Sequence, residues 1–299
     1  MNENLSGRII CGVGGLYTVL CSDGKTVKCK ARGILRKKKI TPLAGDLVTV
    51  RRGDGEEKGL FIDTVSERKT ELSRPPVANI DTVFVLLCPS DPEPNLLATD
   101  KLLVAISSAG ITPVVVISKS DTAPEKAAEL FDIYSKCYVT FLSSAEKNEG
   151  ISELFEFISE KTTVCAFAGA SGVGKSTLLG TLFRELSLKT GKISEKTHRG
   201  KHTTREVTLF PLGEGHFVAD TPGFSRLDFD SEKYFPENQL FFCFPEFEKY
   251  FGKCKYKGCT HLCEEGCAVV EAVRLGEIPK SRHENYIAIY NELKTNRKY

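Results

Sequence analysis

The stretch GASGVGKST, residues 169–177, contains every fixed position of the phosphate-binding pattern G-x-x-x-x-G-K-[ST]. Its glycines let successive backbone N–H groups turn toward phosphate oxygens, and the helix expected after it adds the positive end of its dipole. Lys175 supplies an ammonium for the β- and γ-phosphates, and Ser176 supplies a hydroxyl for Mg²⁺. The predicted phosphate contacts are Gly169, Ala170, Ser171, Gly172, Val173, Gly174, Lys175, Ser176 and Thr177.

The flanking sequence alternates short apolar runs with helical stretches. Runs typical of buried strands occur at residues 81–88, 112–118, 138–144 and 163–170, and amphipathic segments separate them. Strands that alternate with helices indicate a parallel sheet, on which ligands bind at the carboxyl ends of the strands. The sequence therefore predicts a nucleotide-binding α/β domain.

Two further motifs, SKSD (residues 118–121) and SSA (residues 143–145), each follow a predicted strand. Asp121 can accept hydrogen bonds from both guanine N1–H and the guanine 2-amino group, a pattern that adenine does not offer. The stem of Lys119 can lie along the base, and a backbone N–H of SSA can meet the guanine O6. The predicted base site comprises Ser118, Lys119, Ser120, Asp121, Ser143, Ser144 and Ala145. Asparagine usually stands where this chain has Ser118, and we expect the shorter side chain to lose a tie to the phosphate loop.

The motif DTPG, residues 220–223, follows the strand-like run GHFVA. Asp220 at a strand end can hold Mg²⁺ through water, and the Gly223 N–H can meet the γ-phosphate. Between the phosphate loop and this motif lies RGKHTTR, residues 199–205, a polar loop suited to a segment that senses the γ-phosphate. Either Thr203 or Thr204 would offer its hydroxyl to the metal, and His202 is a candidate for orienting the attacking water.

The first 72 residues have a different pattern. Short strand-like runs are separated by glycine-containing turns without helical periodicity, which predicts a small β-barrel of the OB type, a fold that often binds oligonucleotides. RPPVAN, residues 74–79, is expected to be a linker. Basic residues are concentrated within this barrel, with no acid between Asp23 and Asp46. They are Lys25, Lys28, Lys30, Arg32, Arg36, Lys37, Lys38 and Lys39, a distribution typical of a polyanion-binding surface.

Four potential metal ligands are close together near the C-terminus: Cys254, Cys259, His261 and Cys267. Three thiolates and one imidazole suit a closed, tetrahedral Zn²⁺ site. Cys263 is an additional thiol, so a different set of four ligands stays open, as do free thiols without metal. Nearby Lys249, Lys253, Lys255 and Lys257 suit contact with RNA.

The overall composition is that of a globular protein. Of 299 residues, 41% are hydrophobic and 27% are charged, and no apolar run is long enough for a spanning helix. The N-terminus lacks the pattern of a secretory signal, so we expect a cytoplasmic protein without a membrane partner. Nothing in the sequence indicates an obligate dimer, and a monomer is expected.

The guanine motif precedes the phosphate loop here, whereas in most GTPases it follows. The order SKSD, SSA, phosphate loop, HTT and DTPG resembles that of the circularly permuted GTPases. With a barrel ahead and a cysteine cluster behind, nearly the whole chain resembles the RsgA family, the ribosome small-subunit-dependent GTPases. The resemblance implies an N-terminal OB-type β-barrel over residues 1–72, a circularly permuted P-loop GTPase domain over 73–230 and a mainly helical zinc-binding domain over 231–299.

The resemblance also implies a function and its ligands. It implies GTP hydrolysis stimulated by the small ribosomal subunit during late subunit maturation, with GTP or GDP, Mg²⁺ and one Zn²⁺ per chain bound and ribosomal RNA contacted. Cys254, Cys259, His261 and Cys267 match the family's zinc pattern. Phe224 stands where many GTPases carry the glutamine that orients water, which implies slow intrinsic hydrolysis and favours the alternative of an RNA-binding assembly protein that uses GTP only as a ligand. The alternative of an ATP-dependent transporter or kinase is supported only by the phosphate loop, and Asp121 argues against it.

Overall fold

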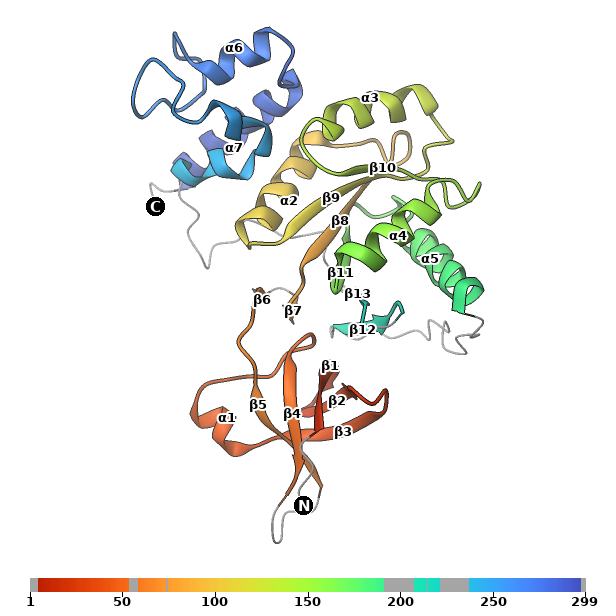
Figure 1. The fold of residues 1–299 in the computed structure, drawn as a ribbon. Helices are drawn as coiled ribbons and strands as arrows, with labels where there is room; N and C mark the ends of the chain where they lie inside the picture. Colours follow the sequence, from red (N-terminus) through yellow and green to blue (C-terminus); the bar gives the residue numbers. More distant parts are fainter. Residues whose placement is uncertain are drawn as a thin grey trace. The chain divides into compact units, whose positions relative to one another are not determined.

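The computed structural model describes residues 5–53, 59–73, 75–190, 207–213, 215–220 and 237–296 (Figure 1). The chain forms two compact units, each built from several segments. The first comprises Met1–Val83, Glu153–Phe167 and Leu182–Phe224, and the second comprises Phe84–Ser152, Ala168–Thr181 and Ser225–Tyr299.

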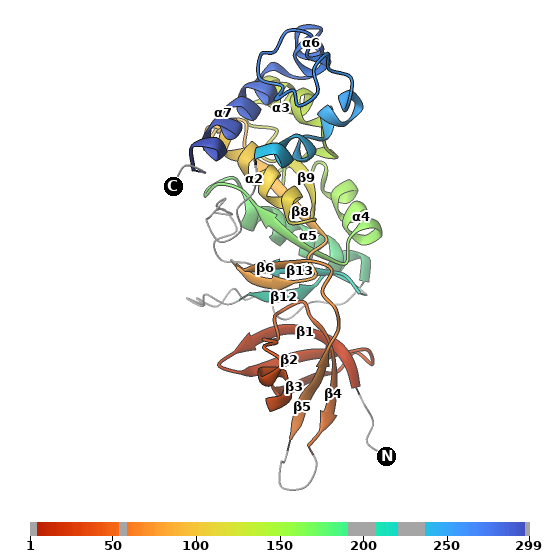
Figure 2. The ribbon, with the colours of Figure 1, turned by 90° about the vertical axis from the view of Figure 1, so that its left-hand side faces the viewer.

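A closed five-stranded barrel occupies the N-terminal part of the first unit (Figure 2). Its strands are β1 (Leu5–Val13), β2 (Leu16–Cys21), β3 (Thr26–Ala31), β4 (Leu47–Arg52) and β5 (Leu60–Val65). They pair in the order β1-β2-β3-β5-β4, and β1 closes the barrel by pairing antiparallel with β4. Because side chains alternate along a strand, residues such as Ile9, Val19 and Ile62 fill the interior and are fully buried. The predicted OB-type barrel is confirmed.

A short helix, α1 (Gly33–Lys37), lies between β3 and β4, where the sequence showed no helical periodicity. Five residues are too few for such a pattern to be detected. Leu35 is the buried residue of this helix. Arg36 and Lys37 in its last turn are exposed, and so are Lys38 and Lys39 after it. The helix therefore presents consecutive basic side chains to solvent.

The prediction of a linker at residues 74–79 is wrong, because Pro76–Ala78 in the described part of this stretch is a strand of a hairpin. β6 (Glu71–Ser73) pairs antiparallel with β7 (Pro76–Ala78), and Val77 also forms a bridge to Ala44. A side chain at Gly45 would come within 1.9 Å of the Ala78 carbonyl oxygen, so only glycine allows this approach. Long-range pairing, which the local Pro-Pro signal does not reveal, orders the segment.

The first unit continues the barrel's sheet with three strands of the α/β region. β11 (Val164–Ala168) runs parallel to β13 (Phe217–Asp220), and β12 (Thr208–Pro211) pairs antiparallel with β13. β12 also contacts β1, with Cys11 opposite Thr208. Helices α4 (Ile151–Lys161) and α5 (Lys175–Thr190) flank β11 in the sequence.

The second unit contains strands β8 (Thr82–Leu87), β9 (Thr112–Ile117) and β10 (Thr140–Leu142), in the order β10-β9-β8. β9 and β10 are parallel, and every residue of β8 is buried. Helix α2 (Leu96–Ser108) precedes β9, and α3 (Pro124–Ser135) precedes β10. This alternation of strands and helices agrees with the predicted α/β domain. No helix in the described ranges has both the length and the apolar character required to cross a membrane.

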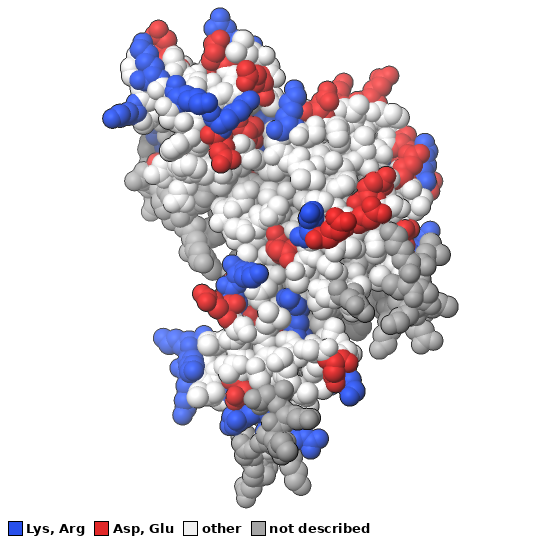
Figure 3. All heavy atoms as spheres, in the orientation of Figure 1, with Lys and Arg blue, Asp and Glu red and all other residues white. Residues whose placement is uncertain are grey.

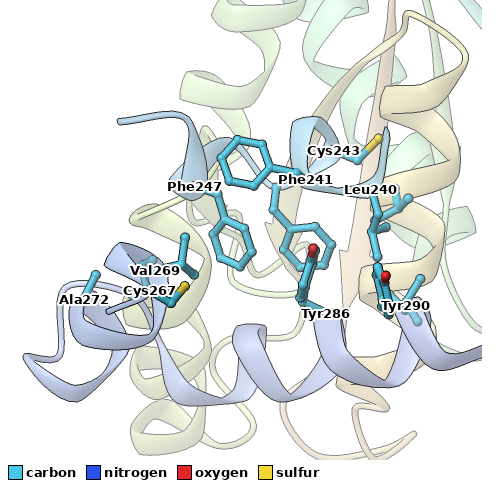
Figure 4. Close-up of a cluster of buried hydrophobic side chains, with 13 residues drawn as sticks. Leu240, Phe241, Cys243, Phe247, Cys267, Val269, Ala272, Tyr286 and Tyr290 are labelled. Atoms are coloured by element: carbon cyan, nitrogen blue, oxygen red, sulfur yellow. The ribbon is translucent and has the colours of Figure 1, made fainter. Parts of the chain in front are cut away.

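The C-terminal part of the second unit is mainly helical, as predicted. It comprises the 3₁₀ helices η2 (Glu237–Cys243) and η3 (Pro245–Tyr250), followed by α6 (Ala268–Arg274) and α7 (Lys280–Asn296). Aromatic rings dominate its core (Figure 4), in which Phe241, Phe247 and Tyr286 are buried together. Val104 of α2 joins the same cluster, so this part packs on the α/β region of the second unit.

A buried arginine also joins the two parts of the second unit. Arg282 of α7 is fully buried and forms ion pairs with Asp100 of α2 (2.6 Å) and Glu246 of η3 (2.8 Å). Its Nη2 donates to the Tyr138 hydroxyl at 3.0 Å, just before β10. Burial raises the pKa of Asp100, and the Arg282 charge opposes that shift. Removing one partner would leave an uncompensated buried charge, so loss of either carboxylate is expected to destabilise the protein strongly.

Candidate nucleotide site and metal centre

The loop 169–174 has the backbone geometry that its three glycines allow. Gly169, Gly172 and Gly174 have φ values of 137°, 87° and 88°, in the region that residues with a side chain rarely adopt. A Cβ at Gly169 would lie 2.5 Å from the Leu86 carbonyl oxygen. Because glycine relieves both constraints, the loop can turn sharply between the end of β11 and the start of α5.

Lys175 begins α5, and its ammonium turns back over the loop. Its Nζ donates to the carbonyl oxygens of Gly169 (2.6 Å) and Ala170 (2.7 Å). Burial lowers the pKa of Lys175 from its ordinary value. Ser176 and Thr177, in the first turn of the helix, are exposed. A cation, exposed hydroxyls and a helix N-terminus thus lie together at one end of α5, an arrangement that suits phosphate.

The structure brings SKSD and SSA together. The Ser120 N–H donates to the Ser143 carbonyl at 3.1 Å, and the side chains of Asp121 and Ser144 are hydrogen-bonded. The Ser144 bond is the main cause of the lowered pKa of Asp121, which favours the ionised carboxylate that would accept from guanine. Within the described residues, the Ala145 N–H has no hydrogen-bond acceptor and is available to a ligand.

The expectation that Ser118 loses its tie to the phosphate loop is wrong. The Ser118 hydroxyl donates to the Val173 carbonyl oxygen at 2.7 Å and also lies 3.0 Å from the Leu87 carbonyl oxygen. Ser118 is buried, so a short side chain reaches both acceptors without a longer amide. The guanine motif and the phosphate loop are therefore joined directly, although about fifty residues separate them in the sequence.

Lys119 makes a contact that the sequence did not predict. Its backbone has φ +50°, and its Nζ donates to the Asp91 carbonyl oxygen at 2.9 Å. The Lys119 stem also passes Gly174, where an added Cβ would lie 3.7 Å from the Lys119 Cε. The side chain thus lies beside the phosphate loop, where its stem could support a base.

Sequence reasoning missed the proline-rich loop that receives this lysine, residues 88–94. The Ser90 and Thr122 hydroxyls are hydrogen-bonded at 2.8 Å, next to the guanine motif. Pro92 lies beside the phosphate loop, where an added Cβ on Gly172 would lie 3.5 Å from its Cδ. Its place in the sequence could have revealed it, because this loop also follows the carboxyl end of a strand, β8, where ligands bind on parallel sheets.

The remaining predicted catalytic residues are only partly described. Asp220 is the last residue of β13 and is exposed. His202, Thr203, Thr204 and Gly223 lie outside the described residues, as does Phe224.

The predicted metal ligands lie together. The ligand atoms of Cys254, Cys259, His261 and Cys267 are all within 4.8 Å of one another. The Cys254 and Cys267 sulfurs are 3.8 Å apart, and His261 Nδ1 lies 3.5 and 3.4 Å from them. Tetrahedral coordination with Zn–S of about 2.3 Å and Zn–N of about 2.0 Å requires nearly these separations. The four side chains could therefore hold one metal ion.

The surrounding backbone supports the cluster. The Ala268 N–H donates to the Cys254 sulfur at 3.4 Å, and Glu264 accepts from the N–H groups of Thr260 (2.7 Å) and Leu262 (2.9 Å). Burial is the main cause that raises the pKa of Cys259 to about 12, so binding a metal would involve loss of a thiol proton. Cys263 is exposed and does not belong to the group of four, which disfavours the alternative ligand set.

Family profiles match most of the chain. The profile described as RsgA GTPase matches residues 65–230, and the profile described as RsgA N-terminal domain matches residues 6–60. A protein of Alkaliphilus metalliredigens named small ribosomal subunit biogenesis GTPase RsgA is 42% identical over 295 residues. The alignment covers 98% of this chain and 99% of that relative.

Solved structures have the same architecture. The crystal structure of YjeQ from Thermotoga maritima is 32% identical, with a TM-score of 0.82 over 97% of this chain and 99% of that one. The structure of YloQ, described as a circularly permuted GTPase, is 31% identical, with a TM-score of 0.78 over 98% of this chain and 96% of that one. The reversed motif order is therefore that of a permuted GTPase fold, and the chain belongs to the RsgA GTPase family.

Proposed function

We propose that this protein hydrolyses GTP while bound to the small ribosomal subunit, during the biogenesis of that subunit. The main support is the hydrogen bond from the Ser118 hydroxyl to the Val173 carbonyl, which joins the guanine motif to the phosphate loop. Family membership and the name of the Alkaliphilus relative support both the reaction and the partner. The outer segments, residues 1–72 and 231–299, would contact ribosomal RNA.

In this proposal the phosphate loop binds the GTP phosphates through its backbone N–H groups. Lys175 would exchange its two carbonyl acceptors for phosphate oxygens, which are charged and therefore stronger partners. Asp121 would accept from guanine, with Ser144 fixing its carboxylate. The exposed Ser176 hydroxyl would serve Mg²⁺, an ion that neutralises phosphate charge when bound, and the role of Asp220 stays a prediction from the sequence. Roles for His202, Thr203, Thr204 and Gly223 remain predictions from the sequence.

Zinc is the proposed metal at Cys254, Cys259, His261 and Cys267. Three thiolates and one imidazole with near-tetrahedral separations favour Zn²⁺ over Mg²⁺ or Ca²⁺, which prefer oxygen ligands. With four protein ligands the site would be closed and structural. Its contribution would be to the folding of the C-terminal part, where Phe241 lies 4.8 Å from His261 between ring centroids.

Cys259→Ala is expected to reduce the zinc content from one ion per chain to well below one and to make the C-terminal part sensitive to protease. Three ligands bind the metal more weakly than four, and a structural site stabilises its own domain. Elemental analysis and limited proteolysis measure both effects. Cys263→Ala, a matched change at an exposed thiol in the same loop, should retain full zinc. Equal zinc in the two variants would contradict this ligand assignment.

Hydrolysis assays separate the proposed GTPase from the alternative, an RNA-binding assembly protein that uses GTP only as a ligand. GTP turnover by the purified protein is measured with and without purified small subunits. A large stimulation by subunits supports the proposal, because Phe224 suggests that the chain alone orients the attacking water poorly. GTP binding without turnover in either condition would favour the alternative.

Co-sedimentation with small subunits is expected to be stronger with a non-hydrolysable GTP analogue than with GDP. The basic surface after β3 should contribute through RNA phosphates, because Lys37, Lys38 and Lys39 are exposed. Replacing these three lysines by alanine should weaken binding and flatten the slope of log affinity against log salt by about two. Lys136→Ala combined with Lys161→Ala, on exposed positions elsewhere, is the control. Equal sedimentation of the GDP and analogue forms would refute the nucleotide dependence.

A further inference from the structure

Three aromatic side chains of the C-terminal part are exposed beside a densely packed aromatic core. Phe242 and Phe251 are each 66% exposed, and Tyr256 is 52% exposed. The ring centroids of Phe242 and Phe251 are only 5.6 Å apart, although the two residues come from different turns of the chain. Two exposed rings in contact form an apolar patch, and such patches can mark interaction sites.

The buried Phe241 holds this pair in place. The centroid of its ring lies 5.4 Å from that of Phe242 and 5.9 Å from that of Phe251. It also lies 5.8 Å from the centroid of the Phe247 ring. It also lies 4.8 Å from His261 of the metal cluster. The exposed rings are therefore fixed by the core, so a planar ligand could stack on them without first ordering them.

Exposed lysines that follow Phe251 in the chain indicate a polyanion. Lys253, Lys255 and Lys257 are exposed, and within the described residues none of them is paired with a carboxylate. Lys253 is two residues from Phe251, with Gly252 at φ +71° between them, and Lys255 lies 5.2 Å from the Tyr256 ring. Figure 3 shows basic side chains interspersed with acidic ones over this part of the molecule.

These observations distinguish between partners. Lysine is depleted at protein–protein interfaces, whereas unpaired lysines beside exposed rings are the combination that binds single-stranded nucleic acid. We propose that Phe242 and Phe251 form a stacking platform for an unpaired base of RNA, and that Lys253, Lys255 and Lys257 bind the adjoining phosphates. This inference rests on the proposed function, since it names how the C-terminal part meets RNA.

The first test measures sedimentation with purified small subunits as salt is varied. Phe242→Ala combined with Phe251→Ala should weaken binding about tenfold without changing the salt slope, because stacking releases no counterions. Alanine at Lys253, Lys255 and Lys257 should weaken binding and flatten the slope by about two. Leu275→Ala, at an equally exposed apolar residue of the same part, is the matched control. Zinc content and circular dichroism check that each variant is folded.

The second test uses fluorescence, because the chain contains no tryptophan. Phe251→Trp provides a single indole, and a stacked base should quench its emission. A twelve-nucleotide oligoadenylate is titrated into this variant, with inorganic polyphosphate as a probe that carries charge but no base. We expect the oligonucleotide to quench the emission of Phe251→Trp and polyphosphate to leave it unchanged. The emission of Leu275→Trp should respond to neither probe.

The outcomes separate the two proposals. If wild type binds subunits and the phenylalanine variants bind equally well, the platform is refuted and the proposed function stands. If wild type does not bind subunits while oligoadenylate quenches Phe251→Trp, the proposed partner is wrong and the platform stands. Weaker subunit binding by the phenylalanine variants without any quenching would indicate a protein partner and overturn the RNA assignment.

Discussion

Lys175→Ala is expected to lower GTP hydrolysis by subunit-bound protein on the order of 100- to 1000-fold. Phosphoryl transfer depends mostly on positioning and on stabilising charge that develops on the phosphate oxygens. The Lys175 ammonium is fixed over the phosphate loop by the Gly169 and Ala170 carbonyls, 2.6 and 2.7 Å away, so it requires little reorganisation to meet phosphate. Single-turnover hydrolysis of radiolabelled GTP measures the loss.

A matched variant tests whether losing any lysine from this unit would lower GTP hydrolysis as much. Lys136→Ala removes one exposed lysine from the same compact unit, immediately after α3, and should hydrolyse GTP like wild type. Circular dichroism should be unchanged for both variants, since Lys175 is only partly buried. Turnover by Lys175→Ala within twofold of wild type would exclude the loop as the site of hydrolysis.

Asp121→Asn is expected to lower GTP affinity about 100-fold and to raise the affinity for xanthosine triphosphate. Xanthine carries an oxygen where guanine carries its 2-amino group, so it needs a donor there, and the asparagine amide provides one. The Asn Oδ1 can keep the hydrogen bond that Ser144 makes with Asp121 in the wild-type protein. Competition between the two nucleotides for a fluorescent analogue measures the exchange.

Asp132→Asn is the control for this change. Asp132 is an exposed residue of α3 and does not belong to the SKSD motif. It should leave the preference for GTP intact. A second readout is thermal stabilisation, since a ligand stabilises the folded state according to its affinity. If Asp121→Asn lost GTP binding without gaining xanthosine triphosphate, Asp121 would have a structural role and guanine recognition would lie elsewhere.

The local motifs were predictable because each works through its own few residues. The phosphate loop needs glycines at fixed intervals, a lysine and the start of a helix, all within nine consecutive positions. The metal cluster is similar: its four ligands lie within fourteen residues, and their chemistry suffices to suggest zinc. The barrel followed from short strand-like runs that glycine-containing turns separate, without helical periodicity.

Other features depended on residues far apart in the chain. Residues 74–79 resemble a linker locally, but Val77 pairs with Ala44 and only Gly45 allows the close approach of Ala78. The substitution of serine at position 118 suggested a weakened site, since side-chain length says nothing about how near the Val173 carbonyl lies. In both cases the contact joins groups that are far apart in the chain, and no short sequence pattern shows that they are close in space.

By itself, the sequence determined which chemical groups this protein carries: a phosphate-loop motif, a carboxylate suited to guanine, a basic barrel and a cluster of potential metal ligands. Only the tertiary structure decided how these parts are connected. It placed SKSD against the phosphate loop, Lys119 on the Asp91 carbonyl and Arg282 between Asp100 and Glu246. The physical reason is that catalytic motifs depend on residue type and short spacing, whereas hydrogen bonds and buried ion pairs between distant segments exist only after the chain has packed.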